Sequence, residues 1–410
     1  MKRIIAFLLS LILIVSLFGC TGGEDDAAQN AQILAERRDR AESYMRNMAT
    51  ILWRATKDIV YSNSSSNTDP TTDMNDLTYI RAGRLYRGMP YSHAAGGPSA
   101  FLEYASEPDE KGIYNISGLT WHSMNGTNKT ARIGNDCASA VGLSWGTLGN
   151  SLKQDSNTKY MTLKYGYLRV GEYVSNEDAH TYTYPVCEEN GYEVMAAAYA
   201  QLQKADAVVR RNKADNNGHA MMVVSVHVDY MEDGTISGAT SYVTVLEQTS
   251  GTIEKEACRY DPELGENVYQ TYLIDKKYTF FDLYSAGYLP ITCKELIDPS
   301  PVAEEAVSDS ITPTTKEDMF IGALLTTRFI ESVTVELCDE SGKVLQSCTA
   351  SPTNRLLYTF DMSVFETDRP EVLRGSIDLS ALAAGSYQCK VTCRLITGTE
   401  LTARDFSFTV

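Results

Sequence analysis

Apolar positions near the N-terminus recur with helical spacing. They are separated by steps of three and four residues, while charged residues fill the positions between them. This period places apolar side chains on one side of an α-helix. We therefore expect a helix over residues 31–60 that packs against the domain following it. The apolar positions are Ala41, Tyr44, Met45, Met48, Ile51, Leu52, Ala55 and Ile59.

The middle of the chain mixes helical and strand patterns. Residues 136–145 and 192–203 favour helices, and residues 207–210 favour a short strand. Two apolar runs, residues 221–230 and 241–248, flank an Asp-Gly turn signal and predict a β-hairpin. Residues 278–288 fit either a helix or an extended apolar segment. The expected fold class is therefore α+β for this part of the chain.

The last hundred residues change character. Apolar and polar residues alternate over residues 332–337, 387–393 and 406–410, a pattern typical of short strands in an antiparallel sandwich. A Tyr two residues before a Cys, Tyr387 and Cys389, resembles the corner of immunoglobulin-like domains. We expect an immunoglobulin-like β-sandwich over residues 315–410. A proline-containing linker over residues 298–314 would separate it from the domain at residues 31–297.

The first 20 residues resemble a bacterial lipoprotein signal. Lys2 and Arg3 precede an apolar run over residues 4–18, and the segment closes on Gly19 and Cys20. The resemblance implies that Cys20 is acylated and that residues 21–30 form a tether. The protein would then be anchored to a membrane of the bacterial envelope, outside the cytoplasm. The alternative is an ordinary secretory signal in which Cys20 has no role.

Composition narrows the possible partners. The chain has 410 residues, a formal net charge of −17 and a hydrophobic fraction of 43%. So acidic a surface repels nucleic acid and anionic headgroups, and we expect no nucleic-acid partner. Nine cysteines are present, and seven remain if Cys20 and Cys137 are set aside, so at least one of those seven is unpaired. No spacing suggests a metal or cofactor site.

Two residues have the pattern of a nucleophile and its base. Cys137 stands in the first turn of a predicted helix, and His219 follows a glycine at the start of a predicted strand. A helix N-terminus and an imidazolium both favour the thiolate, which is the nucleophilic form of cysteine. The alternatives are an inert buried cysteine and a histidine that only satisfies a strand end. His227, farther along the same strand, is a weaker candidate base.

The order of these motifs resembles the NlpC-type and CHAP-type cysteine peptidases, relatives of the papain fold. The matching segments are Met89-Pro90-Tyr91, Asp136-Cys137-Ala138-Ser139, Ala205-Asp206-Ala207, Gly218-His219 and Glu247-Gln248. The resemblance covers about residues 79–290 and implies a papain-like domain. Ala138 stands where the family usually has serine, and Ser92-His93-Ala94 replaces the usual Trp-Gly-Gly.

The resemblance also implies roles for these residues. Cys137 attacks an amide carbonyl, His219 moves the proton, and Glu247 orients the imidazole, with Gln248 as an alternative orienting residue. Tyr91 and Gln248 lie on the oxyanion or substrate side. The implied substrate is a peptide of peptidoglycan. Two alternatives stay open: an inactive scaffold that binds wall or host glycopeptides, and an amidase of the same fold with another substrate.

Overall fold

The computed structural model describes most of the chain. The described residues are 24–62, 77–91, 96–102, 104–117, 121–123, 134–149, 158–175, 182–211, 218–249, 258–302, 304–352, 357–366 and 373–410. The expected signal peptide and Cys20 lie outside these ranges. Within them, no helix is both long enough and apolar enough to cross a membrane.

The first helix, α2 (Glu24–Thr50), is displaced from the prediction at both ends. It extends back through the expected tether, because the alanine and glutamine residues that follow Asp26 have favourable helix propensities. It stops ten residues early. Beyond Thr50 the chain forms β1 (Leu52–Ala55), in which Trp53 and Ala55 are buried and alternate with more exposed residues. Residues 52–55 form a strand despite their helical spacing, because β1 forms hydrogen-bonded pairs with a strand on each side.

A five-stranded sheet forms around β1 in the order β11-β12-β4-β1-β5. In this sheet β1 pairs with β4 and β5, and β12, from a distant part of the chain, pairs with β4. A three-stranded sheet in the order β3-β2-β6 lies outside it. The strands are β4 (Leu85–Arg87), β5 (Ile113–Ile116), β11 (Cys258–Asp261), β12 (Glu266–Gln270), β2 (Ile59–Ser62), β3 (Leu77–Ile80) and β6 (Trp121–Ser123).

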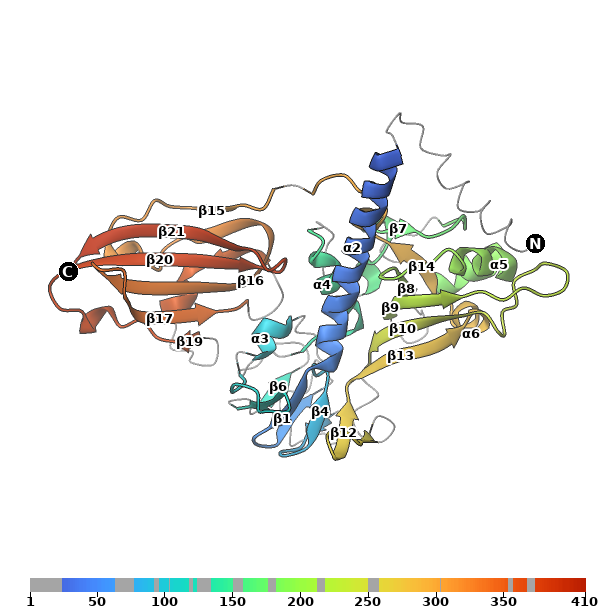
Figure 1. The fold of residues 1–410 in the computed structure, drawn as a ribbon, viewed down its shortest axis with the longest axis horizontal. Coiled ribbons are helices and arrows are strands. Elements are labelled where there is room, and N and C mark those ends of the chain that lie inside the picture. Colours follow the sequence, from blue (N-terminus) through green and yellow to red (C-terminus); the bar gives the residue numbers. More distant parts are fainter. Residues whose placement is uncertain are drawn as a thin grey trace.

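A six-stranded sheet in the order β13-β10-β9-β8-β14-β7 lies on one side of α2 (Figure 1). It contains the predicted short strand and hairpin, which are confirmed. The segment at residues 278–288 ends a strand and then becomes a short helix. The strands are β7 (Leu168–Arg169), β8 (Ala207–Arg211), β9 (Gly218–His227), β10 (Tyr242–Gln248), β13 (Tyr272–Thr279) and β14 (Leu289–Thr292).

Helices surround this sheet. The predicted helix at residues 192–203 is the second half of α5 (Thr183–Tyr199), which bends at Gly191, where φ is +78°. The helix predicted at residues 136–145 is confirmed as α4 (Cys137–Gly146), which packs against both α2 and β9. The remaining helices are α3 (Pro98–Leu102), α6 (Phe280–Ser285) and the 3₁₀ turns Thr158–Tyr160, Leu163–Tyr165 and Lys294–Leu296.

The C-terminal strands form a seven-stranded set on the other side of α2 (Figure 1). The 17-residue strand β16 is its centre, because it pairs with β15 and β18 near its start and with β17 and β20 near its end. The strands are β15 (Val307–Asp309), β16 (Ala323–Asp339), β17 (Val344–Ala350), β18 (Leu357–Asp361), β19 (Leu373–Gly375), β20 (Ser386–Leu395) and β21 (Glu400–Thr409). The 3₁₀ turns here are Lys316–Asp318, Met362–Glu366 and Leu379–Ala381. This mixed content is compatible with an α+β region followed by a β-sandwich.

The expected linker at residues 298–314 is partly structured. β15 lies inside it and pairs with β16, so the C-terminal sheet begins before residue 315. Arg37 on α2 also donates hydrogen bonds to the carbonyl oxygens of Asp298 and Ser300, at 2.6 and 2.8 Å. The prolines of this segment favoured a linker in the sequence analysis, and the pairing of β15 with β16 was therefore not predicted. Phe329 and Ile396 of the C-terminal part pack into the core of the first part, so the two share apolar contacts.

Candidate functional site

Cys137 is the first residue of the buried helix α4. Asp136 precedes it as the N-cap: its carboxylate accepts from the Ser139 N–H at 2.8 Å, and the Ser139 hydroxyl accepts from the Asp136 N–H at 2.8 Å. This reciprocal capping fixes the chain at the helix start. The N–H groups of a first helical turn have no acceptor within the helix, and the helix dipole is positive there. The Cys137 thiol therefore lies where a negative charge is stabilised.

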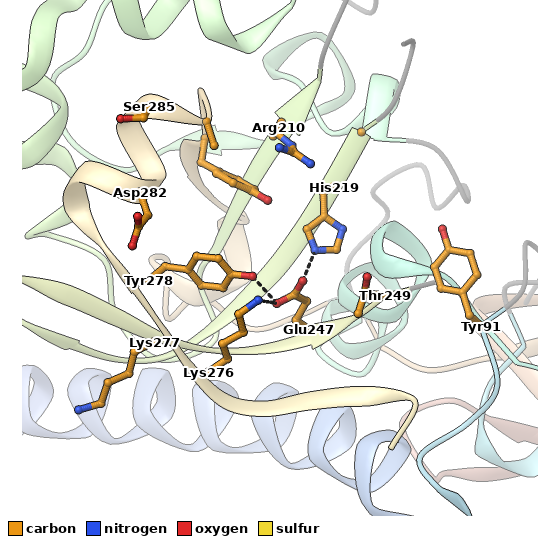
Figure 2. A pocket seen from close by; sticks show the side chains of 13 residues that line it. Tyr91, Arg210, His219, Glu247, Thr249, Lys276, Lys277, Tyr278, Asp282 and Ser285 are labelled. Atoms are coloured by element: carbon orange, nitrogen blue, oxygen red, sulfur yellow. Dashed lines mark hydrogen bonds and ion pairs between the residues drawn. The ribbon is translucent and has the colours of Figure 1, made fainter. Parts of the chain in front are cut away.

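His219 and Glu247 lie on neighbouring strands, β9 and β10. The antiparallel register pairs Val223 with Val245, and side chains two residues apart share a face of a sheet. His219 and Glu247 therefore belong to the same face, and Gln248 belongs to the opposite one. The imidazole Nε2 lies 2.9 Å from Glu247 Oε1, and both side chains are largely buried (Figure 2).

Two more side chains hold the Glu247 carboxylate. The Tyr278 hydroxyl donates to Oε2 at 2.7 Å, and Lys276 Nζ lies 3.6 Å from the same oxygen. Burial acts to raise the pKa of Glu247, but the contacts with His219, Tyr278 and Lys276 outweigh it, and the pKa is lowered. Burial and the bonded carboxylate raise the pKa of Tyr278, so its hydroxyl stays a donor. Glu247 is therefore an ionised acceptor at neutral pH.

His219 contacts both other members of the predicted triad. Burial alone would lower its pKa, but the charge of Cys137, a side-chain hydrogen bond with Cys137 and the contact with Glu247 raise it to about 9. Because Nε2 already faces Glu247, Nδ1 is the nitrogen left for the thiol. The structure thus brings Cys137, His219 and Glu247 together, although they are 82 and 28 residues apart in sequence. The imidazolium form is favoured at neutral pH.

A pocket of about 780 Å³ opens at His219 and Glu247 (Figure 2). This volume suits a small ligand or a few residues of a peptide. Cys137 is 5% exposed and is not among the described residues that line the pocket. The lining residues are Tyr91, Arg210, Gly218, His219, Glu247, Thr249, Lys276, Lys277, Tyr278, Asp282, Ser285, Ala286 and Tyr288.

The two residues expected on the substrate side have different positions. Tyr91 lines the pocket, and its backbone forms a β-bridge with Asn135, next to the start of α4. Gln248 is fully buried away from the pocket and donates to the Met89 carbonyl oxygen at 2.9 Å. It is neither the orienting residue nor a substrate contact in this structure. Strand alternation is the physical reason, because it directs Glu247 and Gln248 to opposite faces.

Several residues around the site were missed from the sequence. Asn135 accepts from the Tyr272 hydroxyl at 2.6 Å and so ties the loop before α4 to β13. Lys276 and Tyr278, on β13, share the face of Glu247. The only sequence signal for their shared face was their spacing, since residues two apart in a strand point to the same side. Asp275, at φ +55°, marks the bulge that shifts the register between β10 and β13 and was not predictable.

No disulfide joins any of the described cysteines. Burial raises the pKa of Cys187, Cys389 and Cys393 to about 12. Burial likewise raises the pKa of Cys293 and Cys338. Among the described residues no group of three or more His, Cys, Asp and Glu side chains is arranged to hold a metal ion.

We expect Glu247→Gln to leave Cys137 reactive toward alkylation while reducing amide turnover by roughly 10²-fold or more, because the carboxylate orients the base and is not itself the base. The measurement is a comparison of the alkylation rate with steady-state hydrolysis for the same preparation. Gln248→Leu is the neighbouring control on the opposite face. Equal losses in both assays for Glu247→Gln would instead assign Glu247 a purely structural role.

Comparison with known proteins does not identify a family for this chain. No family model matches the chain, and no curated protein matches it. A solved structure described as a tetra-tandem repeat in the extending region of a large adhesion protein aligns with a TM-score of 0.18 and 13% identity. The alignment covers 50% of this chain and 41% of that one. At so low a TM-score the likeness supports no conclusion about fold or function.

Proposed function

We propose that this protein is a cysteine peptidase or amidase that hydrolyses amide bonds through Cys137, His219 and Glu247. The observation that supports it most is the position of the His219 imidazole, whose Nε2 lies 2.9 Å from the Glu247 carboxylate and which also forms a side-chain hydrogen bond with Cys137. A helix-start cysteine, a buried imidazole and an orienting carboxylate are the parts of a nucleophilic triad.

The chemistry follows from these positions. The Cys137 thiolate attacks the amide carbonyl carbon, and the C–N bond breaks as His219 gives its proton to the leaving amine. The product is a thioester on Cys137. Water then attacks the thioester carbonyl, and His219 accepts its proton, which releases the carboxylic acid and restores the thiolate–imidazolium pair. The Cys137 N–H, at the first position of α4, is a donor for the oxyanion of both tetrahedral intermediates.

A papain-like fold for the first part of the chain fits the element order. The nucleophile begins α4, α4 packs against β9, and β9 begins one residue before the base. Ala205 supports the match from outside the site. In the peptidases that the chain resembles, the short strand begins with Gly-Asp, and Ala205-Asp206 stands at that place here. The φ of Ala205, +69°, is in the left-handed region that favours glycine. An immunoglobulin-like topology for the C-terminal strands belongs to the same proposal.

The proposed substrate class is a peptide of peptidoglycan, and the proposed location is the outer face of a bacterial membrane. Both rest on the resemblances carried by residues 79–290 and by the N-terminal segment that ends at Cys20. An acylated Cys20 would keep the enzyme near the wall, and the acidic surface gives no affinity for anionic headgroups beyond the anchor.

Digestion of purified peptidoglycan sacculi tests the activity. The chain without its first 20 residues is expected to release peptide fragments that mass spectrometry identifies, and Cys137→Ala is expected to reduce the release by about 10³-fold or more. Cys258→Ala, which removes a half-buried thiol on β11, in a different sheet from β9 and β10, is the matched control and should retain the activity.

Two other results are informative. Equal release by the parent and by Cys137→Ala would contradict the proposal. If the parent releases nothing, the alkylation rate of Cys137 decides: a thiol whose reactivity depends on His219 indicates an amidase with another substrate. A thiol indifferent to His219 indicates a binding scaffold.

A further inference from the structure

Arg210 lies directly beside the proposed base. It is in β8, and the antiparallel register pairs it with His219 in β9. Residues paired in this way have Cα atoms about 4.5–5.5 Å apart, with both side chains on one face. Both side chains line the same pocket, and Figure 2 shows them next to each other. Arg210 therefore lies beside the imidazole that would protonate the leaving amine.

The Arg210 guanidinium has no anionic partner in the described part of the chain. Its Nε atom is buried without a hydrogen-bond acceptor, and no described carboxylate forms an ion pair with it. The guanidinium packs against an aromatic face, because its carbon lies 5.3 Å from the centroid of the Tyr288 ring. A cation over an aromatic ring is held in place, but its N–H donors are not satisfied by it.

This lack of a partner is unusual for such an acidic chain. The sequence contains 53 Asp and Glu residues against 36 Lys and Arg residues, so carboxylates are abundant. The two acids that line the pocket are already engaged. Glu247 is bound by His219, Tyr278 and Lys276, and Asp282 accepts hydrogen bonds from Thr279 at the start of α6.

We infer that Arg210 binds a carboxylate of the substrate, so that the enzyme acts on amides whose neighbouring group carries a negative charge. The inference rests on the proposed function, since it assigns a specificity-determining residue to the same site. A guanidinium forms two parallel hydrogen bonds with a carboxylate, which fixes the orientation of the bound group as well as its distance. The contact with the Tyr288 ring orients the guanidinium before the substrate binds.

Two small alkylating reagents test the inference without knowledge of the substrate. Iodoacetamide is neutral and iodoacetate carries a carboxylate, and with each the Cys137 sulfur bonds to the CH₂ carbon while iodide leaves. Rates are measured at Cys137 by mass spectrometry of the chain without its first 20 residues, at low ionic strength. Arg210→Gln is expected to lower the iodoacetate rate about ten-fold relative to the iodoacetamide rate.

Controls separate this contact from general electrostatics. Lys277→Gln removes another cation that lines the pocket, one that lies over the Tyr242 ring, and should leave the ratio of the two rates within about two-fold. Arg210→Lys keeps the charge but loses the paired geometry, so it should restore only part of the preference for iodoacetate.

The outcomes distinguish this inference from the proposed function. A ratio unchanged by Arg210→Gln, or lowered equally by Lys277→Gln, overturns the role of Arg210 even if iodoacetamide still reacts rapidly. An iodoacetamide rate that is slow and independent of His219 overturns the proposed function itself. A fast iodoacetamide reaction in Arg210→Gln, together with the lost preference for iodoacetate, supports both.

Discussion

His219→Ala is expected to slow the alkylation of Cys137 at pH 6 by on the order of 10- to 100-fold and to abolish amide turnover. The contacts of His219 with Cys137 and Glu247 raise its pKa to about 9, against the effect of burial, so the wild-type imidazole is a cation at pH 6. Alanine removes the positive charge that stabilises the thiolate. The measurement is the iodoacetamide rate at Cys137 between pH 5 and 10, read against the half-buried Cys258 in the same sample.

The same substitution has a pH-dependent effect on stability. Because the folded pKa of His219 is above that of a free imidazole, about 6.5, the protonated form stabilises the folded state. This contribution is fully present below about pH 6.5 and is lost as the pH rises toward 9. The difference in unfolding free energy between wild type and His219→Ala should therefore be largest near pH 6, at about 1–3 kcal/mol, and should shrink by pH 10.

His227→Ala is the control for both measurements. His227 lies eight residues farther along β9, is about half exposed and pairs with Asp229 at 3.2 Å. Its removal should leave the alkylation profile of Cys137 unchanged. A wild-type profile that rises with pH like that of an unassisted thiol, and that is the same in His219→Ala, would rule out the thiolate–imidazolium pair.

Arg38→Ala is expected to destabilise the protein by about 3–5 kcal/mol, because it leaves a buried carboxylate without its cation. Arg38 on α2 bonds Asp206 Oδ1 at 3.0 Å, and both side chains are nearly inaccessible to solvent. Arg38 also donates to the carbonyl oxygens of Lys204 and Leu296, at 2.6 and 3.0 Å. The pair therefore joins α2 to the segment that enters β8. Chemical denaturation monitored by far-UV circular dichroism measures the loss.

The control is Arg40→Ala, which removes an exposed arginine two residues away on the same helix and should change the unfolding free energy by less than about 0.5 kcal/mol. Burial raises the pKa of Asp206 although Arg38 and Thr292 act to lower it, so the carboxylate is costly to leave unpaired. Asp206→Asn in the Arg38→Ala background should recover part of the stability. No recovery would show that the packing of Arg38, and not its charge, is what matters.

Much of the local structure was determined by the sequence. The Asp136 cap and the small apolar residues after it define α4, and the Asp-Gly turn between two apolar runs defines the hairpin of β9 and β10. Both depend on neighbouring residues only, because capping and hairpin turns are formed within a few residues. The candidate residues Cys137, His219 and Glu247 could be identified from the sequence for the same reason, because each stands at a recognisable position in its own helix or strand.

Tertiary structure decided what local patterns left open. Residues 51–55 fit a helical stripe and a strand equally well, and pairing with β4 and β5 made them a strand. Strand β15 forms inside a proline-containing segment because β16 offers it a partner. The choice between Glu247 and Gln248 was likewise settled by which of the two side chains lies on the same face of the sheet as His219. Arg210 emerged only from the register of β8 against β9, since a contact between strands depends on residues that the chain brings together from a distance.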